Sequence, residues 1–419
     1  MTAIILDIND ASLALWRNGE VLLSSPGYAL LQGREYQFGE GARSQARRHP
    51  QQVNHRYWSQ LNTEPMTPAF GPGRHSADLV HSHLLEIHQQ AEQPDELIIA
   101  APGSLQHDQL ALLLGIIDAC PFAATGLVDR AVAAAAEHGG ADYNWHIELQ
   151  LHQALITGLV YRDGELQRDQ LIPIPGAGWL ALQDSLARGI ADAFIRQTRF
   201  DPRRQASTEQ ALYDLLPTLL DTLTHSPEHN LELGGHNARV ERALLAQSCN
   251  KHYQRLQAAI AARPGQVLLA DKLATMPDIS ALLPEAQGVD ATAMASSIAR
   301  HEQTICGREQ GLHFITSLPC SKAQTATTDT TAAEPPTEPS AEPAQETVQE
   351  TVSPSRCQID IENHALTLRP LSGPTPQVNG EAANGPVALS DKDIIELADG
   401  TAWQLVQVKP EALADDGST

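Results

Sequence analysis

The chain has 419 residues, enough for two or three compact units with a sizeable core. It carries 51 acidic and 28 basic residues, a formal charge of −23, and only 4% of its residues are aromatic. This charge opposes nonspecific binding to nucleic acid or anionic membranes, and so few aromatic residues argue against stacking platforms for single-stranded nucleic acid.

The cysteines and the hydropathy pattern indicate a compartment. Five scattered cysteines without a C-x-x-C pair fit a reducing cytosol better than a disulfide framework, and they give no metal signature. No apolar run approaches the length of a membrane helix. We therefore expect a cytoplasmic protein that binds neither nucleic acid nor membranes.

The N-terminal segment predicts three antiparallel strands. Ala3–Ile8 and Ser12–Trp16 are the first pair, Asn18-Gly19 is a strong turn signal, and Glu20–Ser25 returns as the third strand. The loop between the first two strands carries Asp7 and Asp10, and carboxylates of this kind commonly shape a turn.

Basic residues and histidines follow. The only concentrated positive patch, which we call the basic patch, is predicted to be a solvated helix face rather than a phosphate or acidic-partner site. It consists of Arg43, Arg47, Arg48, His49, His55 and Arg56. A helix is predicted over Ser76–Gln90, and the histidines on and beside it are expected on the surface rather than around a metal. They are His75, His81, His83 and His88.

The central stretch predicts half of a layered α/β domain. Leu97–Ala101 is a buried strand ending in a Pro-Gly-Ser turn, and an apolar helix from Leu105 to Ile117 follows. Leu127-Val128 and the small-residue helix Arg130–Ala136 complete the pattern.

The second half begins again with strands. Trp145–His152 alternates and pairs with Ala154–Val160, and Tyr161–Leu166 makes another hairpin. A helix is predicted from Leu180 to about Thr198, and a long amphipathic helix is predicted to end at Ala262.

This order of elements resembles the nucleotide-binding domain of seventy-kilodalton heat-shock chaperones, in the actin-like ATPase superfamily. The match rests on the strand exit Ala101-Pro102, the Ala-rich helix Ala131–Ala136 and the closing helix from Gly288 to Ala295. The resemblance implies an α/β, two-lobed actin-like fold over residues 1–320. Lobe I would span about 1–140, lobe II about 141–290, and a closing helix 290–305.

In that family, glycine-rich loops bring backbone N–H groups close to the phosphates. Here the first loop, Leu6–Ser12, and the second, Glu148–Ala154, contain no glycine, and Ala270-Asp271-Lys272 replaces a Gly-Gly turn near the adenosine. ATP or ADP with magnesium would therefore bind weakly or not at all. The residues that the resemblance places around a nucleotide are Asp7, Asn9, Ser12, Gln150, Gly176, Arg239, Asp271 and Lys272.

The C-terminal part has a different composition. Residues 321–356 are rich in Pro, Thr and Glu and are predicted to be a disordered, acidic linker. Residues 357–410 predict a small all-β domain, similar in part to the second half of forkhead-associated modules. We expect it to be an adaptor for a protein partner.

Two functions remain open. The first is a heat-shock-chaperone-like scaffold or regulatory binding protein with degenerate nucleotide loops. The second is an active ATP-binding ATPase whose phosphate loops have been rebuilt, with Asp7 positioning magnesium-bound water. A peptide-folding chaperone is disfavoured because the chain lacks that family's long substrate-binding region. The sequence assigns no catalytic residue, no metal site and no oligomeric state.

Overall fold

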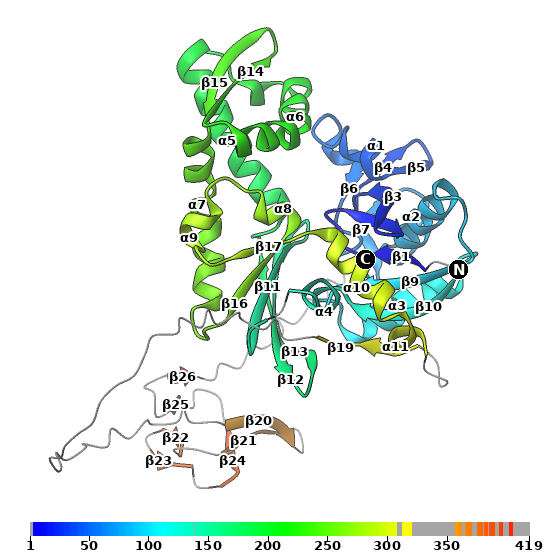
Figure 1. Cartoon of the computed structure of the whole chain (residues 1–419), viewed down its shortest axis with the longest axis vertical. Helices are drawn as coiled ribbons and strands as arrows, with labels where there is room; N and C mark the ends of the chain where they lie inside the picture. The colour runs from blue at the N-terminus through cyan, green and yellow to red at the C-terminus, as the bar shows by residue number, and fades with distance from the viewer. Residues whose placement is uncertain are drawn as a thin grey trace, which may run out of the picture. The chain divides into compact units, whose positions relative to one another are not determined.

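Figure 1 shows the computed structural model of the chain. It describes residues 3–138, 140–307 and 312–320, and the stretches 357–362, 365–370, 375–379, 381–383, 385–389, 394–396 and 402–404. The residues group into two compact units, Met1–Thr328 and Asp329–Thr419. The predicted linker, 321–356, lies outside the described residues.

The first unit contains two six-stranded mixed sheets. In the first sheet the strand order is β3-β2-β1-β9-β10-β18, with β1 to β3 antiparallel and β9, β10 and β18 parallel to β1. The bounds are β1 Ile4–Asp7, β2 Leu13–Arg17, β3 Glu20–Ser25, β9 Glu96–Ala101, β10 Ala123–Asp129 and β18 Phe314–Ile315. Asn18 and Gly19 both have positive φ between β2 and β3, as a tight hairpin turn requires.

The second sheet repeats the order of five of these strands, and its sixth strand lies at the opposite edge. Its order is β17-β16-β11-β12-β13-β19, with β11 to β13 antiparallel, β16 and β17 parallel to β11, and β19 antiparallel to β13. The bounds are β11 Tyr143–Leu149, β12 Gln153–Arg162, β13 Glu165–Pro175, β16 Gln266–Ala270, β17 Gln287–Val289 and β19 Ser317–Pro319. The matching central strands are therefore β1 and β11.

Helices cover both faces of each sheet (Figure 1). On the first sheet, α2 (Ser76–Gln90) and α3 (His107–Asp118) share one apolar core with the outer face. Between the sheets, α4 (Arg130–Ala135) and α10 (Ala291–Arg300) pack against each other and against residues of both inner faces.

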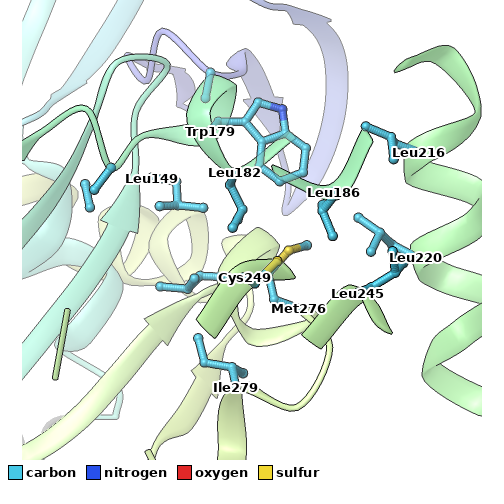
Figure 2. Packing of buried hydrophobic residues seen from close by; sticks show 14 of the residues in the cluster. Leu149, Trp179, Leu182, Leu186, Leu216, Leu220, Leu245, Cys249, Met276 and Ile279 are labelled. Atoms are coloured by element: carbon cyan, nitrogen blue, oxygen red, sulfur yellow. The ribbon is translucent and has the colours of Figure 1, made fainter. Parts of the chain in front are cut away.

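The largest core lies on the outer face of the second sheet (Figure 2). Here α5 (Trp179–Thr198), α6 (Ala206–His225) and α7 (Arg242–Ile260) contribute their apolar side chains to one cluster with those of β11. Leu149, Leu182, Leu186 and Cys249 are among the side chains that meet there. The strand Tyr143–Leu149 thus alternates between this apolar face and a polar inner face, which carries Asn144, His146 and Glu148.

Smaller elements extend the two layers. Those between β3 and α2 are β4 Ala29–Gln32, β5 Glu35–Phe38, α1 Gly39–Arg43, η1 Pro50–Gln52, β6 Val53–Asn54, β7 Pro65–Phe70 and β8 Gly73–His75. Those in the second half are η2 Pro202–Arg204, β14 Glu228–Leu233, β15 His236–Glu241, α8 Asp271–Ala274, α9 Ile279–Leu282 and α11 Glu302–Cys306. Among the described helices, none combines the length and apolar composition that crossing a bilayer needs.

One short segment closes both sheets. Phe314 and Ile315 pair in parallel with β10 at the edge of the first sheet. Ser317 to Pro319, two residues further on, pair antiparallel with β13 at the edge of the second. The segment Phe314–Pro319 therefore joins two edges whose residues lie about 190 and about 150 positions earlier in the chain.

The α/β class that the sequence predicts is confirmed, as are the first three strands and the helix over Ser76–Gln90. The prediction of surface histidines is wrong for His83 and His88, which are buried. His83 Nδ1 accepts hydrogen bonds from Tyr57 and Trp58, and its Nε2 bonds with Ser25 at 2.8 Å. On the same helix, His88 Nε2 donates a hydrogen bond to the carbonyl of Pro94. Helical spacing alone did not reveal that this face is turned toward the core.

In the second unit every described element is a strand. The strands β20 and β21 pair antiparallel with each other and β24 with β21, whereas β22, β23, β25 and β26 form a separate sheet. The bounds are β20 Cys357–Glu362, β21 Ala365–Pro370, β22 Gln377–Val378, β23 Glu381–Ala382, β24 Val387–Leu389, β25 Ile394–Glu396 and β26 Ala402–Gln404.

Candidate functional site

A buried arginine joins the two central strands. Arg130, the first residue of α4, donates from Nε and Nη2 to the two carboxylate oxygens of Asp7, at 2.7 and 3.0 Å. Its Nη1 donates to the carboxylate of Glu148. Asp7 ends β1 of the first sheet and Glu148 lies near the end of β11 of the second. The guanidinium therefore lies between carboxylates from matching places in the two sheets.

The loops that follow these strands also bind each other. Asp10 Oδ1 accepts a hydrogen bond of 2.7 Å from the backbone N–H of Leu151, and Asn9 Nδ2 donates to the carbonyl of Leu149 at 3.1 Å. We call these two contacts the loop clasp. Lys272 adds a third link, because its Nζ donates to the carbonyl of Ala11 at 3.1 Å.

Burial sets the electrostatics of this cluster. Burial raises the pKa of Glu148 to about 7, and Arg130 offsets only part of that effect. Burial also raises the pKa of Asp10 to about 6, against the hydrogen bonds from Leu151 and Ala11 and the charge of Lys272. Burial lowers the pKa of Arg130, but Asp7 and Glu148 outweigh it and the net direction is upward, so the arginine stays charged.

Two cavities adjoin the cluster and share Ser12, Ser24 and Lys272 in their walls. One has a volume of about 220 Å³ and lies beside Asp7, Arg130 and His146. The other has about 450 Å³ and lies against Trp179 and the helix α6.

The residues present do not fit a magnesium–nucleotide group. A magnesium ion would be expected to use carboxylates such as Asp7 and Glu148, but Arg130 already pairs with both. A phosphate would need free backbone N–H groups, but that of Leu151 is bound to Asp10 and that of Ala11 to the Asn9 side chain. The carboxylates and backbone N–H groups that such a group would need are thus already paired within the chain.

The structure brings half of the sequence-predicted residues together. Asp7, Asn9, Ser12 and Lys272 line the cavity of about 220 Å³. Ser12 Oγ lies 3.1 Å from Ser24 Oγ. Asp271 is the first residue of α8, directly before Lys272.

The other predicted residues lie elsewhere. Gln150 bonds with Ser104 at 3.0 Å and lines a separate cavity of about 50 Å³. Gly176, with φ +70°, forms a turn after β13, and its carbonyl accepts from Arg255. Arg239 lies on the exposed hairpin of β14 and β15, where it pairs with Glu228 and Glu241. Neither Gly176 nor Arg239 lines the cavity beside Asp7.

The prediction of a solvated basic patch is wrong for two of its arginines. Arg47 pairs with Asp184 of α5 at 2.7 Å and lies over the ring of Tyr213, and Arg43 pairs with Asp214 of α6. His55 from the same patch lies 3.1 Å from His152. These contacts tie the segment after β5 to the second half of the unit.

Sequence reasoning missed Arg130 as a site residue. The available signal was one charged residue at the start of a helix that otherwise consists of Ala and Val. Asp129 next to it caps α4 and pairs with Arg168 of β13, which gives a second ion pair between the sheets. The local sequence does not indicate that Arg130 pairs with Glu148 and Asp7, which lie 18 and 123 positions away.

No three His, Cys, Asp or Glu side chains of the described residues gather in a way that could hold a metal ion. No protein-family model matches the chain, and no curated protein is significantly similar to it.

Proposed function

We propose that this chain is a non-hydrolytic scaffold or regulatory binding protein built on a two-lobed, actin-like architecture. Two observations support the architecture: five strands follow the same order in both sheets, β3-β2-β1-β9-β10 and β13-β12-β11-β16-β17, and helices α4 and α10 pack between the sheets. The lobes would then be the halves organised around β1 and β11.

The observation that carries the functional proposal is the Arg130 guanidinium between Asp7 and Glu148. Phosphoryl transfer relies on a bound metal ion and on donors that hold the phosphates, because little else stabilises the transition state. Here a metal ion would have to displace a buried, doubly paired arginine, and a phosphate would have to break the loop clasp. Both steps cost free energy that nucleotide binding must supply.

An ATP-binding function is the second candidate, and the cavity of about 450 Å³ favours it. That cavity lies next to Lys272 and is bounded by α5, α6 and α8, so it offers room that does not depend on the loop clasp. A nucleotide could bind there through its base while its phosphates remain outside the clasp. A protein partner remains part of the proposal, with the second unit as the adaptor.

Calorimetric titration of the full chain with magnesium-ATP tests the proposal, together with an assay for phosphate release. We expect no saturable heat, no phosphate release and no shift of the melting temperature. A ligand present at one hundred times its Kd would stabilise the fold by about 2.7 kcal/mol, which a melting curve detects readily. Saturable binding in the micromolar range would overturn the proposal, and phosphate release lost in Asp7→Asn would establish the second candidate.

A further inference from the structure

Part of the basic patch lines a further cavity, of about 350 Å³, which we call the patch cavity. Residues between Tyr28 and Arg56 form one part of its wall, and His152 and Tyr213 belong to the other part. The patch cavity is therefore lined by segments that are far apart in the sequence. Its volume lies within the roughly 300–1,000 Å³ that sites for small molecules have.

One arginine of this wall has no counterion. Arg43 pairs with two carboxylates, and Arg47 pairs with Asp184, which also lines the cavity. Arg56 is exposed, and over the described part of the chain its guanidinium forms neither an ion pair nor a hydrogen bond. The wall therefore carries one positive charge that is open to an anion.

The histidine pair of the wall has an open donor. His152 Nε2 lies 2.9 Å from the carbonyl oxygen of His55 and 3.1 Å from His55 Nδ1. A carbonyl only accepts, so the hydrogen is on His152 Nε2, and His55 Nδ1 is a second acceptor for it. Burial, then His152 and then Arg56 lower the pKa of His55 to about 4, so its imidazole is neutral at pH 7. Its one hydrogen is therefore on Nε2. No described residue accepts that hydrogen, and the nitrogen is not among the unpartnered atoms that are closed off from solvent.

Tyr28 supplies a second open donor next to this one. Its ring meets that of His55 edge-on, with the ring centroids 5.6 Å apart. The side chain is only 4% exposed, and its hydroxyl has no hydrogen-bond partner among the described residues. This hydroxyl is not closed off from solvent either, so it opens into the cavity that Tyr28 lines. Burial raises the pKa of Tyr28, so the hydroxyl keeps its proton and calls for an acceptor.

We infer that the patch cavity binds a small organic carboxylate. The two carboxylate oxygens accept from Arg56, from the Nε2–H of His55 and from the hydroxyl of Tyr28. A carboxylate suits these groups because it only accepts, whereas all three open groups donate. Its single charge matches the one arginine of the wall that has no counterion.

The rest of the wall indicates the body of the ligand. Pro50, Val53, Leu151 and Leu180 line the cavity with apolar side chains, against which an aromatic ring or a short aliphatic chain buries its surface. Inorganic phosphate is the competing occupant, since it also pairs with an arginine but has no apolar part. The site uses neither a metal ion nor a nucleotide, so this inference goes beyond the proposed function and is tested separately from it.

Sodium benzoate is the probe, and saturation-transfer NMR of its ring protons with the full chain, at constant ionic strength, is the readout. Benzamide has the same ring without the charge, and inorganic phosphate has the charge without the ring. We expect saturable binding of benzoate at millimolar concentration or below, and no saturable binding of benzamide in that range. An equal concentration of phosphate should not displace benzoate.

The variant Arg56→Gln removes the open charge, and Arg48→Gln is the matched control. Both arginines are exposed members of the basic patch, so the fold tolerates either change, but only Arg56 lines the cavity. Arg56→Gln should weaken benzoate binding by about tenfold or more, and Arg48→Gln should leave it unchanged. Tyr28→Phe deletes only the hydroxyl and should weaken binding by about fivefold or more.

Benzoate that does not bind saturably would overturn the inference. Equal weakening in Arg56→Gln and Arg48→Gln would also overturn it, because the attraction would then belong to the basic patch as a whole. Displacement of benzoate by an equal concentration of phosphate would assign the cavity to a bare anion, and equal binding of benzamide would show that the carboxylate is not recognised.

Discussion

Replacing Arg130 with methionine tests the link between the two sheets directly. The change keeps an unbranched apolar side chain but removes all three hydrogen bonds to Asp7 and Glu148. The two carboxylates stay buried, with side chains only 6% and 0% exposed, and they lose their shared cation. Removing one partner from a buried ionic cluster costs about 3–5 kcal/mol, a large part of the 5–15 kcal/mol that a domain typically has.

The loss of stability in Arg130→Met should depend on pH. Without Arg130, the pKa of Glu148 rises further, so the folded chain holds a proton that the unfolded chain releases. Stability of the variant therefore falls as pH rises from the usual Glu value of 4.5 through 7 and beyond, and acid restores part of it. Glu148→Gln added to Arg130→Met should restore stability in the same way at neutral pH.

Urea unfolding followed by circular dichroism, at pH 5.5 and at pH 8, measures these effects. Arg300→Met is the matched control, because Arg300 is 64% exposed and its ion pair is with Glu137. We expect that control to change the free energy of unfolding by less than about 0.5 kcal/mol. A loss below about 1 kcal/mol in Arg130→Met, or one equal at both pH values, would refute the reasoning.

Three further predictions concern the clasp, a buried histidine and the core. Asp10→Ala leaves the Leu151 N–H without its acceptor and should lower the free energy of unfolding by about 1–3 kcal/mol, whereas Asp10→Asn keeps an acceptor and should cost less. Burial lowers the pKa of His83 to about 3 from its usual 6.5, so its contribution is present above pH 6.5 and is lost as pH falls toward 3. That loss reaches about 2.7 kcal/mol near pH 4.5, and His83→Gln should remove it from an acid titration of stability. Leu186→Ala opens a cavity in the core of Figure 2 and should cost about 2–5 kcal/mol in thermal or urea unfolding.

Each of these three predictions has an outcome that would contradict it. Equal stability of Asp10→Ala and Asp10→Asn would mean that the hydrogen bond to Leu151 contributes nothing. An unchanged acid transition in His83→Gln would show that another group controls it. A loss below about 1 kcal/mol in Leu186→Ala would mean that this core closes over the missing side chain.

The strands and helices of the first unit were largely predictable because their signals are local. Apolar alternation around Asn18-Gly19 identifies the first hairpin, and the 3.6-residue period identifies the helix over Ser76–Gln90. Burial within those elements was less predictable. His83 is a core residue because Ser25, Tyr57 and Trp58, all from outside its helix, satisfy both of its nitrogens.

The sequence predicted those residues of the candidate site that lie at the ends of strands and in the loops that follow them. Asp7, Asn9, Ser12 and Lys272 do meet around one cavity, as the resemblance implies. Arg130 was missed because its role exists only through residues of two different sheets. Arg239 was placed near the site by its position in the order of elements, yet its hairpin extends away from the cavity and its charge is satisfied by two neighbours.

The segment Phe314–Pro319 has a consequence for synthesis. The first sheet begins with Ile4 but receives its last strand only at Phe314, so a growing polypeptide cannot finish it until almost the whole first unit has left the ribosome. Until then β10 and β13 both present open edges, which favour pairing with other chains. The N-terminal half therefore cannot complete its fold ahead of the C-terminal half, although chains usually fold from the N-terminus during translation.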